Sequence, residues 1–274
     1  MIKNILLILF IILFLFMIIR FFFKYKFNKY FYTKVEKLFE LSEDISNQKV
    51  NFENLKSLPG PVRKYFRYSL TDGIHYISSV RMKHEGEFKM GKDKGWVPIK
   101  GRQYYTSEPP GFVWKGDIRF ASAIDSYIDG EGRLMAKAFS IFKVIDLKSD
   151  KMNEAEFMRW LTEAVLFPTA LLPSRNIKWE YIDQSSAKLI YKNNGNAPEC
   201  KVFFNDKNQI TEFKSKRYDG EKIKTWGGIV SNYKRINNMM IPTQIEAYWE
   251  KNDKKSRYAK FSITEIDYNT TKLF

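Results

Sequence analysis

Cysteine and histidine are both scarce in this sequence, and their scarcity excludes several kinds of protein. Cys200 is the single cysteine among 274 residues, so the chain forms no intramolecular disulfide. It lies in a Glu-Cys-Lys-Val-Phe-Phe stretch that is typical of a strand, which indicates a structural position and not a nucleophile. Because no cysteine lies near the N-terminus, lipid attachment to an N-terminal cysteine is excluded as well.

The sequence also lacks the motifs of common catalytic and metal sites. His75 and His84 are the two histidines, and neither has an HExxH or similar metal-binding spacing. No Gly-x-Ser-x-Gly motif presents a nucleophilic serine. Residues 86–93 nearly match a phosphate-binding loop, but Asp93 stands where the magnesium-binding Ser or Thr belongs, and the surrounding pattern is strand-turn-strand. We therefore predict no catalytic residue, no metal ion and no cofactor.

Positive charge is present in excess, with a net charge of +15. Such a charge can serve an anionic partner, either nucleic acid or acidic lipid headgroups. The lysines are scattered along the whole chain, however, and no zinc finger, basic zipper or other nucleic-acid motif is present. We expect no nucleic-acid partner and interpret most of the charge as solvation of the surface.

A long apolar segment opens the chain. From residue 5 to residue 23 every residue is apolar except Arg20. A helix of this length spans about 28 Å, close to the bilayer hydrocarbon thickness of about 30 Å. A cleaved signal peptide is the alternative, but the segment is longer than usual and no small-residue cleavage site follows it. The sequence predicts a single-pass protein of the cell membrane, with an anchor over residues 1–29 and the lipid bilayer as a partner.

Flanking charge predicts the side of the membrane on which the rest of the chain lies. Lys3 and the terminal amine precede the apolar segment. A larger group of basic residues lies at its end and after it: Arg20, Lys24, Lys26, Lys29, Lys34 and Lys37. The positive-inside rule then places the C-terminal domain in the cytoplasm. An extracytoplasmic location of the domain is the alternative, because long domains can translocate despite flanking charge.

Beyond the anchor, hydrophobic periodicity predicts an α+β fold that is mainly antiparallel. Residues 30–78 have helical spacing of apolar residues and are expected to form a juxtamembrane helical segment. Residues 79–274 contain stretches in which apolar and polar side chains alternate, as in half-buried strands. Turn residues, 193–195 among them, recur about every ten residues without long helical crossovers, which favours antiparallel meanders.

One helix is expected to interrupt these strands, over residues 153–167. Asn153 suits its N-cap and Pro168 its end. An apolar helix between two sets of strands should lie on the concave face of their sheet. The predicted architecture is a curved half-barrel meander packed on this central helix, preceded by the transmembrane helix.

Aromatic residues are the candidates for binding an apolar ligand, with a plain hydrophobic core as the alternative. The candidates for a cavity lining are Tyr105, Trp114, Trp160, Trp179, Trp226 and Trp249. A second group, Arg63, Arg159 and Glu163, is expected to be buried and polar. Glu163 follows Arg159 by one helical turn, so an ion pair that holds the helix on the sheet is favoured over acid–base catalysis. Asp125 and Asp129 are expected to share one face of a strand.

Three segments resemble a bacterial and archaeal family of unknown function. Its members carry a Leu-Pro-x-x-Val-Arg-x-Tyr motif, which residues 58–65 match, and an Arg-Trp/Tyr-Leu-x-Glu segment followed by Pro and a Leu pair, which residues 159–172 match. An Ile-Pro before a strand that ends in Trp matches residues 241–249. The resemblance covers about residues 58–268 and assigns no catalytic role to any residue.

The order of strands and helix is also similar to the lipoprotein-carrier fold of LolA and LolB type, and this resemblance implies binding of a lipid or acyl chain. The chain departs from the periplasmic carriers, whose signals are cleaved. We expect a non-enzymatic, membrane-anchored binding module for a lipid or another apolar small molecule. The alternatives are a protein-interaction scaffold at the membrane surface and a hydrolase that uses buried carboxylates.

Overall fold

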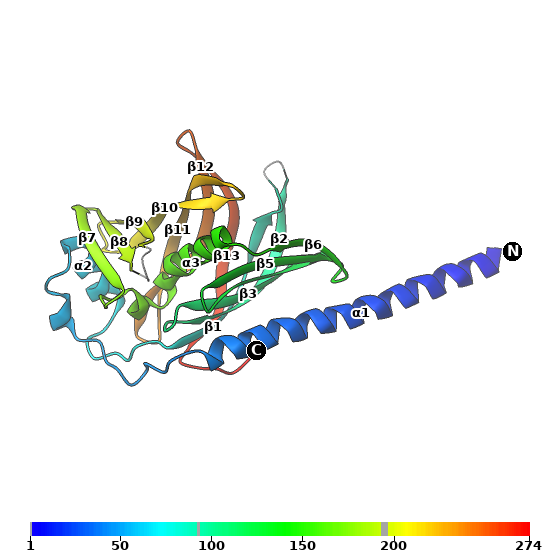
Figure 1. The fold of residues 1–274 in the computed structure, drawn as a ribbon, viewed down its shortest axis with the longest axis horizontal. Coiled ribbons are helices and arrows are strands. Elements are labelled where there is room, and N and C mark those ends of the chain that lie inside the picture. The colour runs from blue at the N-terminus through cyan, green and yellow to red at the C-terminus, as the bar shows by residue number, and fades with distance from the viewer. Residues whose placement is uncertain (1, 92–93, 193–196) are drawn as a thin grey trace.

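The computed structural model describes residues 2–91, 94–192 and 197–274, and Figure 1 shows how its elements are arranged. Lys92 and Asp93, which belong to the segment that nearly matches a phosphate-binding loop, lie outside the described residues. The expected turn at 193–195 does so as well.

α-Helices and short 3-10 helices (η) occur in three stretches of the described chain, and strands make up most of the rest. The helical elements are α1 (Ile2–Glu40), η1 (Phe52–Leu55), α2 (Gly60–Ser69), α3 (Asp150–Glu163), η2 (Ala164–Leu166) and η3 (Pro168–Leu171). The strands before α3 are β1 (Ser79–Lys89), β2 (Trp96–Thr106), β3 (Gly111–Asp117), β4 (Ala121–Ile128), β5 (Glu131–Ala138) and β6 (Phe142–Leu147). Those after it are β7 (Ile177–Asp183), β8 (Ser186–Tyr191), β9 (Glu199–Phe204), β10 (Ile210–Asp219), β11 (Lys222–Ile236), β12 (Met239–Lys251) and β13 (Lys254–Tyr268).

The strands form one antiparallel sheet in the order β6-β5-β4-β3-β2-β1-β13-β12-β11-β10-β9-β8-β7. Two meanders, β1 to β6 and β7 to β13, are therefore joined by the pairing of β1 with β13. The two edge strands, β6 and β7, are consecutive in the sequence, and α3 with its following turns connects them across one face (Figure 1). The prediction of a mainly antiparallel sheet with a helix between two meanders is confirmed.

The N-terminal helix is longer than the anchor predicted from the sequence. α1 continues without a break to Glu40, because residues 24–40 contain no Gly or Pro to end it. The expected juxtamembrane helix from residue 30 is thus the continuation of α1. By length and composition its apolar part could cross a membrane, and no residue of that part is buried in the protein. A long apolar N-terminal helix of this kind is found in both membrane anchors and signal sequences.

The second part of α1 packs against the outer face of the sheet. Phe27, Phe31, Val35 and Leu38 recur at helical spacing and are buried. They contact a row of side chains from β2 to β5: Tyr104, Val113, Ile124, Ile128 and Met135. Side chains alternate across a strand, so Tyr104 faces α1 whereas Tyr105 faces the inner core. α1 is therefore joined to the domain by a small hydrophobic core of its own.

The central helix begins and ends earlier than expected. Ser149 is its N-cap, with its hydroxyl accepting a hydrogen bond from the Met152 N–H at 3.2 Å. Asn153, the predicted cap, instead accepts a hydrogen bond from the N–H of Gly132 in β5 at 2.7 Å. A Cβ atom on Gly132 would lie 2.5 Å from the Met152 carbonyl oxygen, so glycine lets the start of α3 approach the sheet. After Glu163 the chain forms the turns η2 and η3 in place of the predicted last helical turn.

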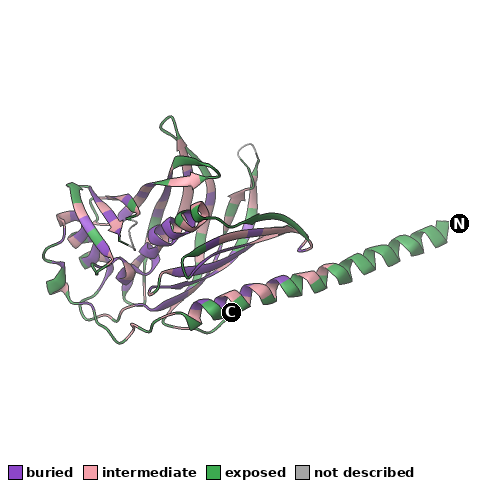
Figure 2. Cartoon of the chain, in the orientation of Figure 1, coloured by how far each residue is buried: buried purple, intermediate pink, exposed green. Residues whose placement is uncertain are grey.

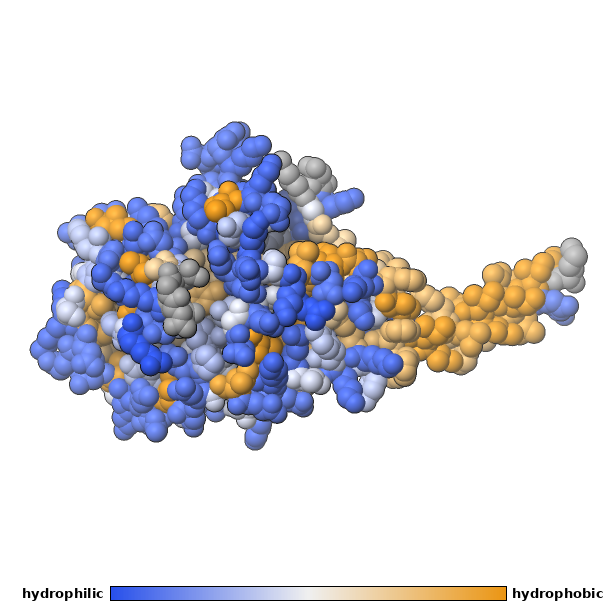
Figure 3. All heavy atoms as spheres, in the orientation of Figure 1, coloured by the Kyte–Doolittle hydropathy of each residue, from blue (hydrophilic) through white to orange (hydrophobic). Residues whose placement is uncertain are grey.

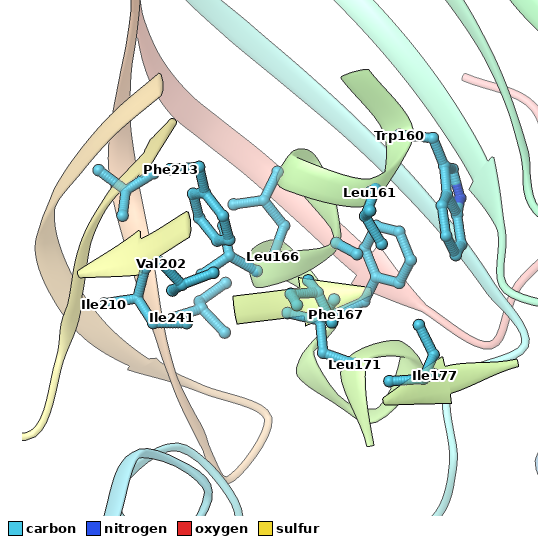
Figure 4. Close-up of a cluster of buried hydrophobic side chains, with 14 of the residues drawn as sticks. Trp160, Leu161, Leu166, Phe167, Leu171, Ile177, Val202, Ile210, Phe213 and Ile241 are labelled. Carbon is cyan, nitrogen blue, oxygen red and sulfur yellow. The ribbon is translucent and has the colours of Figure 1, made fainter. Parts of the chain in front are cut away.

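The end of α3 and the turns after it lie in the inner core. Figure 4 shows a cluster of buried side chains that we call the closed end: Trp160, Leu161, Leu166, Phe167 and Leu171 against Ile177, Val202, Ile210, Phe213 and Ile241. α2 adds Tyr65 and Phe66, whose rings contact Phe204 and Trp179. Figure 2 shows that buried residues concentrate along α3 and the neighbouring strands, whereas the first part of α1 is exposed.

Candidate functional site

The aromatic residues predicted to line a cavity lie in or against the inner core. Tyr105 and four of the tryptophans are buried, and Trp249 is half-buried with its ring stacked on Tyr258. Each buried indole N–H donates a hydrogen bond inside the protein: Trp114 to His84 Nε2, Trp160 to the Thr106 carbonyl, Trp179 to the Leu171 carbonyl and Trp226 to the Tyr258 hydroxyl. Buried indoles satisfied in this way are characteristic of a core.

His84 is a buried partner of Trp114. Its Nε2 accepts the Trp114 indole N–H at 2.7 Å, and its ring stacks on Phe261 with centroids 4.2 Å apart. Burial, and secondarily the charge of Arg159, lowers the pKa of His84 to about 3. The histidine is therefore neutral at physiological pH, and its packing is that of a core residue.

A cluster of charged and polar side chains lies between α3 and the sheet. Arg159 is its centre: Nη1 lies 2.7 Å from Asp125 Oδ2 on β4, and Nε lies 2.9 Å from Glu163 Oε1. The other oxygen of Glu163 accepts hydrogen bonds from Gln103 Nε2 at 2.8 Å and the Tyr105 hydroxyl at 2.9 Å. Glu163 is thus held by three partners from α3 and β2, which removes the motive for assigning it acid–base chemistry.

Glu156 extends this cluster to β10. Its Oε1 accepts a hydrogen bond from Arg217 Nη2 at 2.8 Å. Burial, followed by the charge of Asp125, raises the pKa of Glu156 well above its usual range. Glu156 Oε2 and Asp125 Oδ1 are both buried and have no partner among the described residues. The raised pKa favours the protonated form of Glu156, whose carboxyl group can donate a hydrogen bond to Asp125.

We call these residues the buried polar cluster: Gln103, Tyr105, Asp125, Glu156, Arg159, Glu163 and Arg217. Its geometry fits a structural role that fixes α3 on the sheet, because Arg159 and Arg217 join Glu163, Asp125 and Glu156 across helix and strands. Within the part of the chain that the structure describes, no group of three or more His, Cys, Asp or Glu residues is arranged to hold a metal ion.

A groove of about 960 Å³ opens beside the first turns of α3, toward β8, β9, β10 and β11. Its apolar lining includes Tyr127, Ala155, Phe157, Met158, Ile182, Ala197, Pro198, Cys200 and Ile223. Its charged lining includes Asp150, Glu154, Lys188, Glu199, Lys201, Lys214, Lys216, Arg217 and Glu250. The volume lies in the range of small-molecule sites. None of the six aromatic residues predicted to bind a ligand is among the described residues that line it.

Cys200 lies in this lining as a structural thiol. The side chain is buried on β9, and burial raises the pKa of the thiol. A thiol with a raised pKa is a poor nucleophile, because the thiolate is the reactive form. Cys200 therefore contributes to the groove as a small apolar residue.

The sequence profile of a family of unknown function, DUF6544, matches residues 48–261. The chain belongs to this family. The match confirms the resemblance carried by residues 58–65, 159–172 and 241–249, and it begins after α1. No curated protein sequence matches the chain.

Two solved structures are similar to this one at low sequence identity. A LolA superfamily protein from Nitrosomonas europaea is 8% identical with a TM-score of 0.41, and the match covers 79% of this chain and 93% of that one. A domain described as an outer membrane lipoprotein-sorting protein, from Vibrio parahaemolyticus, is 9% identical with a TM-score of 0.42, covering 80% and 94%.

Sequence reasoning located part of the buried polar cluster. It grouped Arg159 with Glu163 but missed Glu156, although Glu156 lies three residues before Arg159 on the same helical face. Gln103 and Arg217 come from separate strands, so no local pattern connects them to α3.

Two other expectations need correction. Arg63 is half-buried on α2, and its Nη1 donates to the Lys56 carbonyl at 3.1 Å, so it is neither fully buried nor part of the cluster. Asp129 does not share a strand face with Asp125. It lies in the turn between β4 and β5 with a φ of 53°.

Proposed function

We propose that this DUF6544 protein is a membrane-anchored, non-enzymatic binding module that holds a lipid or a similar apolar molecule in the groove beside α3. The observation that carries the proposal is the groove itself, which is lined by both apolar and charged side chains. An amphiphile fits this combination, with its acyl chain on Phe157 and Met158 and its polar head among the charged side chains. The charged lining also includes Lys201 and Lys216, whose ammonium groups contact the Phe203 ring at 4.9 Å and the Thr225 hydroxyl at 2.9 Å.

The anchor is the second part of the proposal. Residues 5–23 are apolar except for Arg20, and this stretch of α1 is exposed. Residues 20–32 contain none of the small side chains that a signal peptidase requires. We therefore assign α1 as an uncleaved span of the cell membrane. The positive charges that follow the span favour the cytoplasmic side for the domain.

The alternatives have less support. A hydrolase would need a carboxylate free to transfer protons, whereas Glu163 is engaged by Arg159, Gln103 and Tyr105. A scaffold without an interior binding space would have no use for a groove of about 960 Å³. Ligand binding is the function for which the groove and the anchor both have a role.

Native mass spectrometry of the full chain, released from lipid nanodiscs, tests the proposal. We expect a reproducible extra mass that matches one lipid per chain, and extraction followed by lipid analysis to identify it. A bare protein mass under conditions that preserve the fold would contradict the proposal.

Neighbouring residues of β7 provide a matched control for the groove. Ile182 lines the groove, whereas Tyr181 is exposed and not among the lining residues. We expect Ile182→Asp to lose the bound lipid, because a charge in the apolar wall opposes burial of an acyl chain. Tyr181→Asp should retain it. Equal loss in both variants would show that the lipid binds elsewhere.

A further inference from the structure

A group of exposed apolar side chains lies at one end of the sheet, beside α1. Phe120, in the turn between β3 and β4, is 50% exposed. Phe142 and Val144 of the edge strand β6 are each 60% exposed. Phe139, in the turn between β5 and β6, is half-buried between Phe120 and α1. We call these four residues the apolar tip. Soluble surfaces seldom gather large apolar side chains in this way without a partner.

Aromatic contacts join the apolar tip to the apolar part of α1. The rings of Phe16 and Phe139 meet edge to face with centroids 6.3 Å apart, and the rings of Phe139 and Phe120 lie 5.6 Å apart. Figure 3 shows that the hydrophobic surface of α1 continues onto the adjoining side of the domain. The apolar surface of α1 therefore extends onto the apolar tip of the domain.

We infer that the apolar tip enters the same membrane leaflet that α1 leaves, so that the domain contacts the bilayer at a second place. This inference rests on the proposed anchor. Phe16 lies seven residues before the end of the apolar segment, which places it about 10 Å inside that end along the helix. Phe139 packs at the level of Phe16. A depth of about 5–10 Å is typical of side chains at the boundary between headgroups and acyl chains.

Basic residues beside the tip fit a lipid partner better than an apolar protein surface. The Arg119 guanidinium lies 4.9 Å from the centroid of the Phe120 ring. Lys143, whose Nζ pairs with Asp146 at 2.9 Å, follows Phe142 on β6. Arg20 and Lys24 of α1 are at the end of the apolar segment. Long basic side chains with apolar stems can reach the headgroups while neighbouring rings enter the acyl region.

The insertion is limited to the tip. β6 is an edge strand, and its unpaired backbone groups need water or headgroups as partners, because hydrocarbon offers none. The rest of β6 therefore lies at headgroup level. Ile145 and Leu147 continue the exposed apolar surface along it, and the chain then reaches Asp150, which lines the groove. The tip thereby orients the domain so that β6 leads from the leaflet toward the groove.

Spin-label accessibility on the full chain in phosphatidylcholine and phosphatidylglycerol liposomes tests the inference. Nitroxides are attached in turn at Phe120→Cys, in the turn between β3 and β4, and at Phe142→Cys, at the start of β6. Both positions are exposed, so the labels leave the core intact. Phe10→Cys reports the anchor, and Lys254→Cys reports the exposed start of β13. The native Cys200 is buried and labels slowly, and the unsubstituted chain measures that background.

We expect the ratio of oxygen to nickel-chelate accessibility at positions 120 and 142 to rise several-fold above that at position 254, toward the value at position 10. A lipid-like value at position 10 with water-like values at 120 and 142 would overturn the inference and leave the anchor intact. Water-like values at all positions would overturn both the anchor and the tip. Lipid binding in the groove is measured separately by mass spectrometry. A result against lipid binding is therefore distinguishable from a result against insertion of the apolar tip.

Discussion

The two ends of the concave face differ although they share one helix and one sheet. At the closed end, the chain after α3 brings Leu166, Phe167 and Leu171 onto the sheet, and all three are fully buried. At the groove end, the first turns of α3 bring Asp150 and Glu154, and space of about 960 Å³ remains beside them. The comparison teaches that a curved sheet does not by itself define a cavity. The residues that the connecting segment places on it decide where the face is filled.

The buried polar cluster lies between these two ends. Arg159 joins α3 to β4, and Arg217 of β10 meets Glu156 on the same helix. Ion pairs with fixed geometry position an element more narrowly than apolar contacts, which tolerate sliding. We attribute to this cluster the placement of α3 that leaves the groove open on one side.

The largest effect on stability is expected at the closed end. Phe167→Ala should lower the free energy of unfolding by about 3–5 kcal/mol, because it leaves a cavity in a close-packed region. Urea unfolding of the full chain in detergent, followed by tryptophan fluorescence, measures the change. Tyr181→Ala, at an exposed aromatic residue, is the control. Similar losses in both variants would contradict the assignment of the closed end as the main core.

The next largest loss of stability is expected in the buried polar cluster, where Arg159→Met should lower the free energy of unfolding by about 3 kcal/mol. Arg159→Met removes the positive charge and leaves Asp125 and Glu163 without it in a buried site. Arg63→Met is the matched control, since that arginine is half-buried and makes one hydrogen bond to a backbone carbonyl. The same unfolding measurement compares them. A loss at Arg159 no larger than that at Arg63 would show that the cluster does not fix α3.

An effect that is smaller per pH unit is expected from the titration of Glu156. The pKa of Glu156 is raised in the folded protein above its ordinary value of 4.5, so the folded state keeps a proton that the unfolded state releases. The stabilisation is complete below that ordinary value and is lost as pH rises toward the folded-state pKa. One such proton changes stability by at most about 1.4 kcal/mol per pH unit.

Glu156→Gln, which is neutral at every pH, should flatten this dependence. Urea midpoints between pH 5 and pH 8 measure it in both proteins. Equal slopes would mean that Glu156 is already ionised in the folded protein across this pH range.

The smallest effect on stability is expected in the groove. Ile223 is 59% exposed and lines its mouth, so Ile223→Ala should change the free energy of unfolding by less than about 0.5 kcal/mol. It should nevertheless weaken binding of a fluorescent fatty acid by about fivefold, or about 1 kcal/mol, through lost apolar contact. A fluorescence titration measures this. The opposite pattern, with lost stability and unchanged binding, would place Ile223 in the core and the ligand elsewhere.

Local sequence patterns predicted what depends on neighbours along the chain. Each of these patterns repeats within a single helix or strand. They are the apolar helix, the alternation of side chains along the strands, and the spacing of Arg159 and Glu163. The cap of α3 was misplaced by four residues, because Ser149 and Asn153 are both good caps and the contact with Gly132 decides between them. The six aromatic residues chosen for a cavity have side chains suited to either a core or a ligand, and composition does not separate the two.

The sequence by itself determined that this DUF6544 chain has a long apolar N-terminal helix and a mainly antiparallel sheet interrupted by one helix. Only the tertiary structure decided that α1 packs on the outer face of the sheet, that Glu156 and Arg217 meet, and that the concave face is filled at one end and open at the other. The physical reason is the range of the interactions. Hydrophobic periodicity and turn chemistry act within a few residues, whereas the groove, the polar cluster and the apolar tip arise where elements distant in sequence meet.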